Sequence, residues 1–149
     1  MREDKQFRPD ARAGAAALDV AARSVGDRWS LRVVGALLDG GRTFGELGAD
    51  VDGIAPTILT SRLKALQRLG IVTAVPYERR PPRMRYTLTE PGRRLAGAIA
   101  TLADWGAHRE GHPASRRHDT CGTPVELRAW CPTCERTVED DHASDLIWC

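Results

Sequence analysis

The clearest pattern in the chain is the helical spacing of leucines near its middle. Leu59, Leu63 and Leu66 recur at intervals of four and three, so they fall on one side of an α-helix. Pro56 suits the first turn of that helix, because its missing N–H would be unpaired there in any case. Gly70 suits the position just beyond the helix end. The pattern therefore predicts a helix that begins at Pro56 and buries its leucines.

The opposite side of this helix is polar and basic and carries no acidic residue; it consists of Thr57, Thr60, Ser61, Lys64 and Arg68. Two runs of β-forming residues follow, Ile71–Tyr77 and Met84–Leu88. The segment between them, Glu78–Arg83, is basic and contains two prolines, which we expect to stiffen the tip and stop the edge of the hairpin from pairing further. We therefore predict a helix followed by a β-hairpin with a basic tip.

Helical patterns also occupy the chain before this unit. The alanine-rich run Ala11–Ser24 has high helix propensity, and Trp29–Leu38 carries a broad apolar stripe. Thr43 and Glu46 have the spacing of a capping box, which predicts a short helix between that stripe and the leucine-rich helix. The short helix should pack against the leucine-rich helix through Phe44, Leu47 and Val51.

A last helix is predicted after the hairpin, from a cap at Thr89 to about Arg109. Its long apolar stripe must be covered, either by a second copy of the chain or by Ala11–Ser24 of the same chain. The residues of this stripe are Leu95, Ala98, Ile99, Leu102 and Trp105.

Taken together, these elements predict a mostly α fold with a small β-wing, the winged helix-turn-helix, with the terminal helices forming a dimer interface. The predicted layout is a flexible N-terminus (1–10), a winged-helix domain that includes the terminal helices (11–110), a linker (111–117) and a small tail (118–149). At 149 residues with 42% apolar but only 5% aromatic residues, the core must be built from alanine, leucine and valine, which favours helices.

The distribution of charge indicates the partner. Residues 54–94 contain nine Lys or Arg against two Glu, a balance of about +7, whereas the whole chain carries only +2. Basic charge is therefore concentrated on the leucine-rich helix and the hairpin, where a DNA backbone would need it. The alternative is a basic face that is only solvated.

The residues predicted to contact DNA fall in two groups. Lys can donate to guanine, Thr and Ser can serve several bases, and arginines suit phosphates or the minor groove. On the helix the candidates are Thr57, Thr60, Ser61, Arg62 and Lys64, and on the wing they are Arg79, Arg80, Arg83 and Arg85.

The chain shows no sign of a membrane segment or an export signal. No run approaches the roughly 20 apolar residues of a membrane span, and the N-terminal residues are charged. We therefore expect a cytoplasmic protein without membrane contact. In that compartment thiols stay reduced, so we expect the four cysteines to be metal ligands or sensors rather than a disulfide framework.

The tail carries His118-x2-Cys121 and, after nine intervening residues, Cys131-x2-Cys134. This is the spacing of two zinc knuckles that together supply a tetrahedral His/Cys3 set, and four protein ligands leave no open position, so the zinc would be structural. His142 and Cys149 are spare candidates for the fourth ligand. The alternatives are ordinary reduced thiols, a redox pair at Cys-Pro-Thr-Cys, or a disordered tail.

Two of the tail cysteines also take part in an apparent enzyme motif. His108-x-Glu110 followed by Cys131-x-x-Cys134 superficially copies a zinc deaminase signature. No proline precedes Cys131, a linker lies within the spacing, and no phosphate-binding loop or nucleophile elbow is present. We therefore predict no enzymatic activity.

In several stretches the chain resembles the HxlR-type winged-helix transcription regulators, relatives of the MarR group. The resemblance spans about residues 16–109. The matching stretches are GDRW (26–29), FGEL (44–47), GIAPTILTSRLKALQRLGIV (53–72), PPRMRYTLTEPGRRL (81–95) and ADWG (103–106). It implies a homodimer that binds promoter DNA with two recognition helices and two wings.

Two positions depart from the family pattern. Ala16 stands where many members carry a cysteine, so a thiol switch there is not expected. Ala55 stands where a serine commonly caps the recognition helix, which weakens that cap by about 1 kcal/mol. We predict a sequence-specific regulator, a repressor on a pseudo-palindromic operator, with an effector that the sequence does not identify. The alternative is a protein-interaction module that binds DNA only non-specifically.

Overall fold

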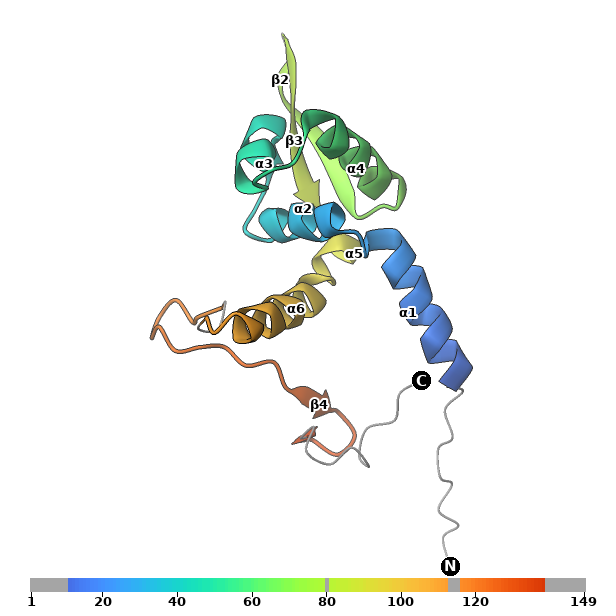
Figure 1. The fold of residues 1–149 in the computed structure, drawn as a ribbon, viewed down its shortest axis with the longest axis vertical. Helices are drawn as coiled ribbons and strands as arrows, with labels where there is room; N and C mark the ends of the chain where they lie inside the picture. Colours follow the sequence, from blue (N-terminus) through green and yellow to red (C-terminus); the bar gives the residue numbers. More distant parts are fainter. Residues whose placement is uncertain (1–10, 80, 113–115, 139–149) are drawn as a thin grey trace, which may run out of the picture. The chain divides into compact units, whose positions relative to one another are not determined.

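The computed structural model describes residues 11–79, 81–112 and 116–138 (Figure 1). They fall into two units, residues 23–125 and the remainder, and each is described by itself. In chain order the elements are α1 (Ala11–Val25), α2 (Arg28–Leu38), β1 (Arg42–Thr43), α3 (Phe44–Asp50), α4 (Pro56–Arg68), β2 (Val72–Arg79), β3 (Pro82–Leu88), α5 (Glu90–Arg93), α6 (Ala96–Arg109), β4 (Ala129–Cys131) and β5 (Arg136–Val138).

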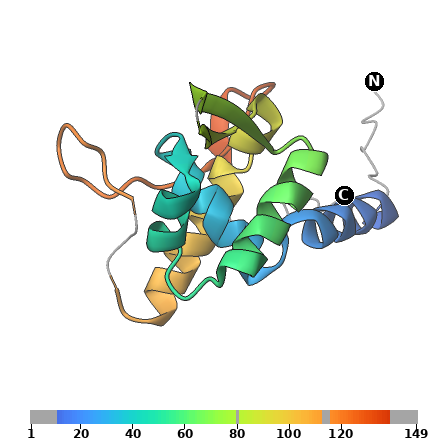
Figure 2. The same cartoon turned by 90° about the horizontal axis from the view of Figure 1, so that it is seen from above.

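The core of residues 23–125 is formed by α2, α3, α4 and the sheet. Both views show α3 and α4 flanking α2 (Figures 1 and 2). The leucines that predicted α4 are buried, with Leu59, Leu63 and Leu66 no more than 2% exposed, and they meet Val33 and Val34 of α2 in one cluster. The prediction of a mostly α fold with a winged helix-turn-helix is confirmed.

The helix ends follow the local sequence signals. The capping box of α3 is complete: Glu46 N–H donates to Thr43 Oγ1 at 3.3 Å, and Thr43 N–H donates to Glu46 Oε2 at 2.7 Å. Helix α4 begins at Pro56 after Ala55, which provides no side-chain cap. Gly70, just beyond the end of α4, has a φ of 67°, a conformation that glycine adopts without a steric penalty.

The wing is a three-stranded antiparallel sheet in the order β1-β3-β2. The two-residue β1 was not predicted. Within the hairpin, β2 and β3 pair as far as Arg79 and Pro82, after a register shift between Pro76 and Glu78. Pro82 is the first residue of β3, a position where a missing N–H is tolerated.

The last helix was predicted as one element from Thr89, but the structure divides it into α5 and α6. Thr89 caps α5 by accepting from Gly92 N–H at 3.2 Å. Gly92 is pressed so closely against the carbonyl oxygen of Ile71 that a Cβ there would collide with it. The break at Leu95 lets this side chain and Ile99 pack on the core, so tight docking of α5 interrupts the helix.

Apolar side chains remain exposed on two helices. On α6, Leu102 is 52% and Trp105 63% exposed; on α1, Leu18 is 71% and Val20 62% exposed. Among the described residues, no helix is both long enough and apolar enough to cross a membrane.

Candidate nucleic-acid interface

The predicted recognition surface is the solvent-facing side of α4. Thr57, Thr60, Ser61 and Lys64 are all exposed on it, because the buried leucines fix the rotation of the helix. The Thr60 hydroxyl donates to the backbone carbonyl of Pro56 at 2.9 Å. Thr60 therefore offers its oxygen lone pairs and its methyl group, rather than its hydroxyl proton, to a partner.

The C-terminal half of α4 extends this surface in a way that the predicted site omitted. An open hollow lies along the helix, lined by Ser61, Lys64, Gln67 and Arg68. Gln67 and Arg68 follow Lys64 by three and four residues, which places all of them along one strip of the helix. That spacing was the signal for including Arg68, whose position on the basic face was already visible in the sequence.

Arg62 was predicted to reach a phosphate, but its guanidinium lies beside a carboxylate of the protein. Its Nε is 3.5 Å from Asp27 Oδ1, close enough for an ion pair, and it is buried without a hydrogen bond among the described residues. Asp27 also caps α2, accepting from the N–H groups of Trp29 and Ser30 at 3.0 Å each. Arg62 thus ties α4 to the start of α2, and a phosphate contact by this residue stays a prediction.

The environment of Asp27 favours its charged form. Partial burial on its own raises the pKa of this carboxyl, but the hydrogen bonds from Ser30, the positive charge of Arg62 and the Trp29 N–H outweigh it. The pKa of Asp27 is therefore lowered, and the carboxylate that joins the two helices is ionised at neutral pH.

The wing arginines differ in their surroundings. Arg83 is exposed and its Nε lies 3.3 Å from Glu78 Oε2 across the hairpin. Arg85 is half-buried, donates to the carbonyl of Gly41 at 2.8 Å, and lies 3.9 Å from Glu46. Arg80 and the side chain of Arg79 lie outside the described residues. Arg83 is therefore free to turn toward a duplex at the cost of a surface ion pair, whereas Arg85 already holds the protein together.

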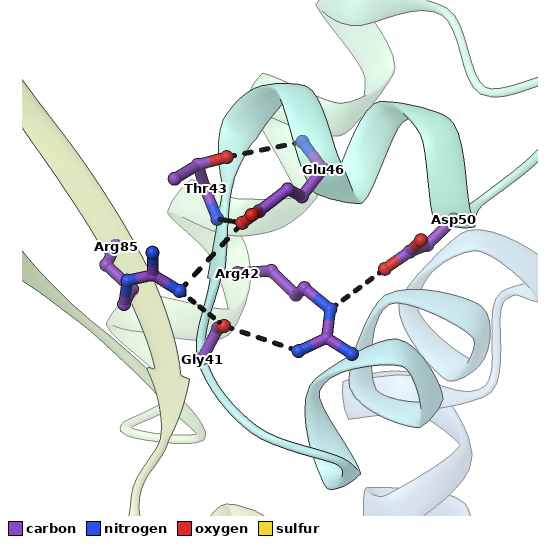
Figure 3. A network of polar contacts seen from close by, with 6 residues as sticks. All are labelled: Gly41, Arg42, Thr43, Glu46, Asp50 and Arg85. Carbon is purple, nitrogen blue, oxygen red and sulfur yellow. Dashed lines mark hydrogen bonds and ion pairs between the residues drawn. The ribbon is translucent and has the colours of Figure 1, made fainter.

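A polar network around Arg85 joins the wing to the start of α3 (Figure 3). Glu46 is its central residue, since this carboxylate accepts from Thr43 N–H and also faces the guanidinium of Arg85. The Thr43 backbone and side-chain hydrogen bonds, followed by the charges of Arg85 and Arg42, lower the pKa of Glu46. Sequence reasoning identified the cap but missed its second role, because Arg85 is distant in the chain.

The carbonyl of Gly41 accepts from two arginines in this network. Arg85 donates to it at 2.8 Å and Arg42 at 3.4 Å, while Arg42 also pairs with Asp50 at 3.0 Å (Figure 3). A Cβ at Gly41 would lie 2.8 Å from Thr87 Cγ2, so the absence of a side chain lets β1 approach β3. The wing and α3 are thus fastened at one point.

The predicted metal ligands appear as two local pairs. His118 Nδ1 lies 3.4 Å from Cys121 Sγ, and Cys131 ends β4 while Cys134 lies in the turn that leads to β5. The hydroxyl and backbone of Thr123 lower the pKa of Cys121, and the Cys134 N–H lowers that of Cys131. Within the described ranges no three His, Cys, Asp or Glu side chains gather at one point. His142 and Cys149 lie outside those ranges.

Comparison with known proteins identifies the helix–wing unit. The family model described as HxlR-like helix-turn-helix matches residues 24–112. The chain belongs to the HxlR-like family. The chain is also 41% identical over 118 residues to the HTH-type transcriptional regulator MT3179 of Mycobacterium tuberculosis (strain CDC 1551 / Oshkosh), covering 76% of this chain and 74% of that protein.

Solved structures agree with this assignment. The redox regulator HypR in its reduced form has a TM-score of 0.60 at 28% identity, covering 63% of this chain and 93% of that one. A transcription factor of Pseudomonas aeruginosa, PA1374, has a TM-score of 0.61 at 32% identity, covering 80% of this chain and 83% of that one. As an HxlR-like protein, the chain is a DNA-binding transcriptional regulator, in a family of regulators rather than of enzymes.

Proposed function

We propose that this HxlR-like protein is a homodimeric repressor that binds a pseudo-palindromic operator through α4 and the wing. The observation that carries the proposal is the exposed, acid-free face of α4, in which Thr57, Ser61 and Lys64 point away from the buried leucines. A helix of this kind fits the major groove, where Lys donates to guanine and Thr or Ser contacts other bases. Arg83 at the wing supplies a phosphate or minor-groove contact.

The dimer is proposed because apolar side chains are exposed outside this surface. Leu102 and Trp105 on α6 and Leu18 and Val20 on α1 each expose about half or more of their area. Covering them with a second copy of the chain removes apolar surface from water and repeats the recognition helix about a two-fold axis. Repression then follows from occupancy, and an effector would act by changing the separation of the two recognition helices.

Enrichment of a random duplex pool on the purified protein at two salt concentrations tests this function. A two-fold-symmetric motif with half-sites about one helical turn apart supports it. Binding without an enriched motif, lost at moderate salt, contradicts sequence-specific regulation. A mass of one chain by light scattering contradicts the dimer. The variant Trp105→Glu should become monomeric and lose affinity for the operator while α4 stays folded. That result supports both the dimer and its binding to a two-fold operator.

A second candidate is a protein-interaction module that holds DNA only through phosphates. The exposed side chains of Trp105 and Leu102 are the observation that favours this module, because a different protein could cover them in place of a second copy of the chain. The double variant Lys64→Ala with Arg83→Ala separates the two functions: it should strongly weaken DNA binding and leave partner binding unchanged. Undiminished DNA affinity in this variant would contradict the assigned DNA surface.

A further inference from the structure

The first observation concerns the loop that carries His118 and Cys121. The loop is closed by backbone hydrogen bonds at 2.8 Å, from His118 N–H to the carbonyl of Thr123 and from Gly122 N–H to the carbonyl of His118. It brings His118 Nδ1 to 3.4 Å from Cys121 Sγ. Two ligands of one tetrahedral zinc, at about 2.05 Å for nitrogen and about 2.3 Å for sulfur, lie about 3.6 Å apart. The pair is therefore already close to the spacing of two metal ligands.

The second loop, in the turn between β4 and β5, repeats this arrangement. Trp130 pairs with Thr137 and Cys131 with Arg136, so the turn runs from Pro132 to Glu135. Cys131 is the last residue of β4 and Cys134 lies three residues further on, inside this turn, which gives the C-x2-C spacing of a zinc-binding pair.

The two loops share a backbone feature. The residue directly after the second candidate ligand is left-handed in both, Gly122 with a φ of 68° and Glu135 with a φ of 51°. Glu135 is the one non-glycine residue with a positive φ in the described part of the chain. A side chain in this conformation costs about 1 kcal/mol or more and persists where the surroundings hold it. A metal bound by the preceding cysteine would supply that restraint.

The segment has too little apolar burial to hold these loops by packing. From His118 to Val138 only Val125, Cys131 and Val138 are even partly buried, and Leu127 and Trp130 are 50% and 59% exposed. The hairpin has three residues in each strand, and an isolated hairpin of this kind is marginal in water. Small segments without a core are commonly held by a structural metal.

We propose that His118, Cys121, Cys131 and Cys134 bind one structural Zn²⁺. The proposal rests on the ligand spacing in the sequence and on the geometry of each loop by itself. Three thiolates and one imidazole favour zinc over hard cations, which prefer oxygen ligands. Binding releases the protons of the three thiols and involves no electron transfer. Four protein ligands leave no position for a substrate, so the role is to fold the tail.

The same observations disfavour a redox pair at Cys131 and Cys134. A reactive thiol of that kind is activated at a helix N-terminus or beside a cation. Here Cys131 ends β4 and Cys134 lies in the turn, no helix begins at either of them, and the charge of Arg136 is the smallest of the influences that lower the pKa of Cys131. Cys121, Cys131 and Cys134 are all free thiols in the structure, and the sulfur of Cys121 lies 3.3 Å from Thr123 Oγ1 and 3.4 Å from His118 Nδ1.

Metal analysis of the full chain, purified without chelator, tests the proposal. We expect about one equivalent of zinc per chain, and its loss in Cys131→Ser, Cys134→Ser, Cys121→Ser and His118→Ala. The matched controls Cys149→Ser and His142→Ala should keep it. Replacement by Co²⁺ should give the visible bands of tetrahedral thiolate coordination, and these should weaken only in the four ligand variants. Circular dichroism then confirms that α1 to α6 remain folded in each variant.

Three results would overturn the proposal. Less than about half an equivalent of zinc in protein never exposed to chelator would exclude a stable site. Loss of zinc in Cys149→Ser together with full zinc in His118→Ala would exclude this ligand set. A Co²⁺ spectrum that is octahedral rather than tetrahedral would exclude coordination by three thiolates.

Discussion

Lys64→Ala should change not only the affinity for DNA but also the way that affinity depends on salt. Lys64 is exposed on α4, and a dimer carries two copies of it. For this prediction each Lys64 is taken to neutralise one phosphate that flanks the bases within its reach. Each such contact contributes about 0.9 to the slope of log K against log salt, so the variant should lose about 1.8 from that slope. Between about 50 and about 200 mM salt, this makes the affinity of the unmodified protein fall roughly 12-fold more than that of the variant.

A change in the wing tests the same surface, but it should raise the affinity for DNA instead of lowering it. Glu78→Gln removes the carboxylate that lies 3.3 Å from Arg83, so affinity should rise while the number of phosphate contacts grows or stays equal. Fluorescence anisotropy on the enriched operator, over a salt series, measures both effects. The matched control is Arg94→Ala, since Arg94 is an exposed arginine paired with Glu90 at 2.8 Å on α5. An unchanged slope in Lys64→Ala, or an equal drop in Arg94→Ala, would refute the assigned surface.

Three further predictions concern stability, each measured by chemical denaturation. Asp27→Ala should lower the free energy of unfolding by about 1 kcal/mol at neutral pH, because it removes the cap of α2. The pKa of Asp27 is lowered from 3.8, so this stabilisation is present above about pH 4 and is lost as the pH falls through the pKa of the folded protein. A stability difference that persists undiminished in acid would contradict this prediction. Gly92→Ala should destabilise the protein by about 1–3 kcal/mol, since its Cβ would collide with the backbone carbonyl of Ile71. In the control Gly106→Ala in α6, the new Cβ meets nothing within 4 Å and should stabilise the protein by about 0.5–1 kcal/mol. Equal effects of the two changes would show that the close approach of α5 to Ile71 is unimportant for stability. Ala55→Ser should supply the missing cap of α4 and stabilise by about 1 kcal/mol, and no gain would mean that the first turn is satisfied in another way.

Local signals predicted most of the helices because neighbours in the chain decide them. The leucine spacing of α4 fixed which side is buried and which side faces a partner, and Leu59 and Leu63 lie in the core as expected. The capping box at Thr43 and Glu46 formed with both hydrogen bonds. These features depend on residues three or four positions apart, which the sequence displays directly.

Features that join distant segments were missed. The break between α5 and α6 depends on Gly92 meeting Ile71, and strand β1 exists only because Arg42 lies opposite Tyr86. Charge alone predicts Arg62 and Arg85 as DNA contacts, although Asp27 and Gly41 lie beside them. A basic residue in a sequence does not reveal whether its partner is a phosphate or an acidic group folded against it.

The contacts that hold the wing at Glu46 also limit how the protein can bind a DNA duplex. The carboxylate that begins α3 also faces Arg85 of β3, so the wing cannot swing far without disturbing the helix start that precedes α4. If α4 and the wing bind the same duplex, the distance between them is fixed before binding, and the DNA must deform to contact both. The base pairs between these two contacts would then be selected by how easily the duplex bends there, although no side chain touches them.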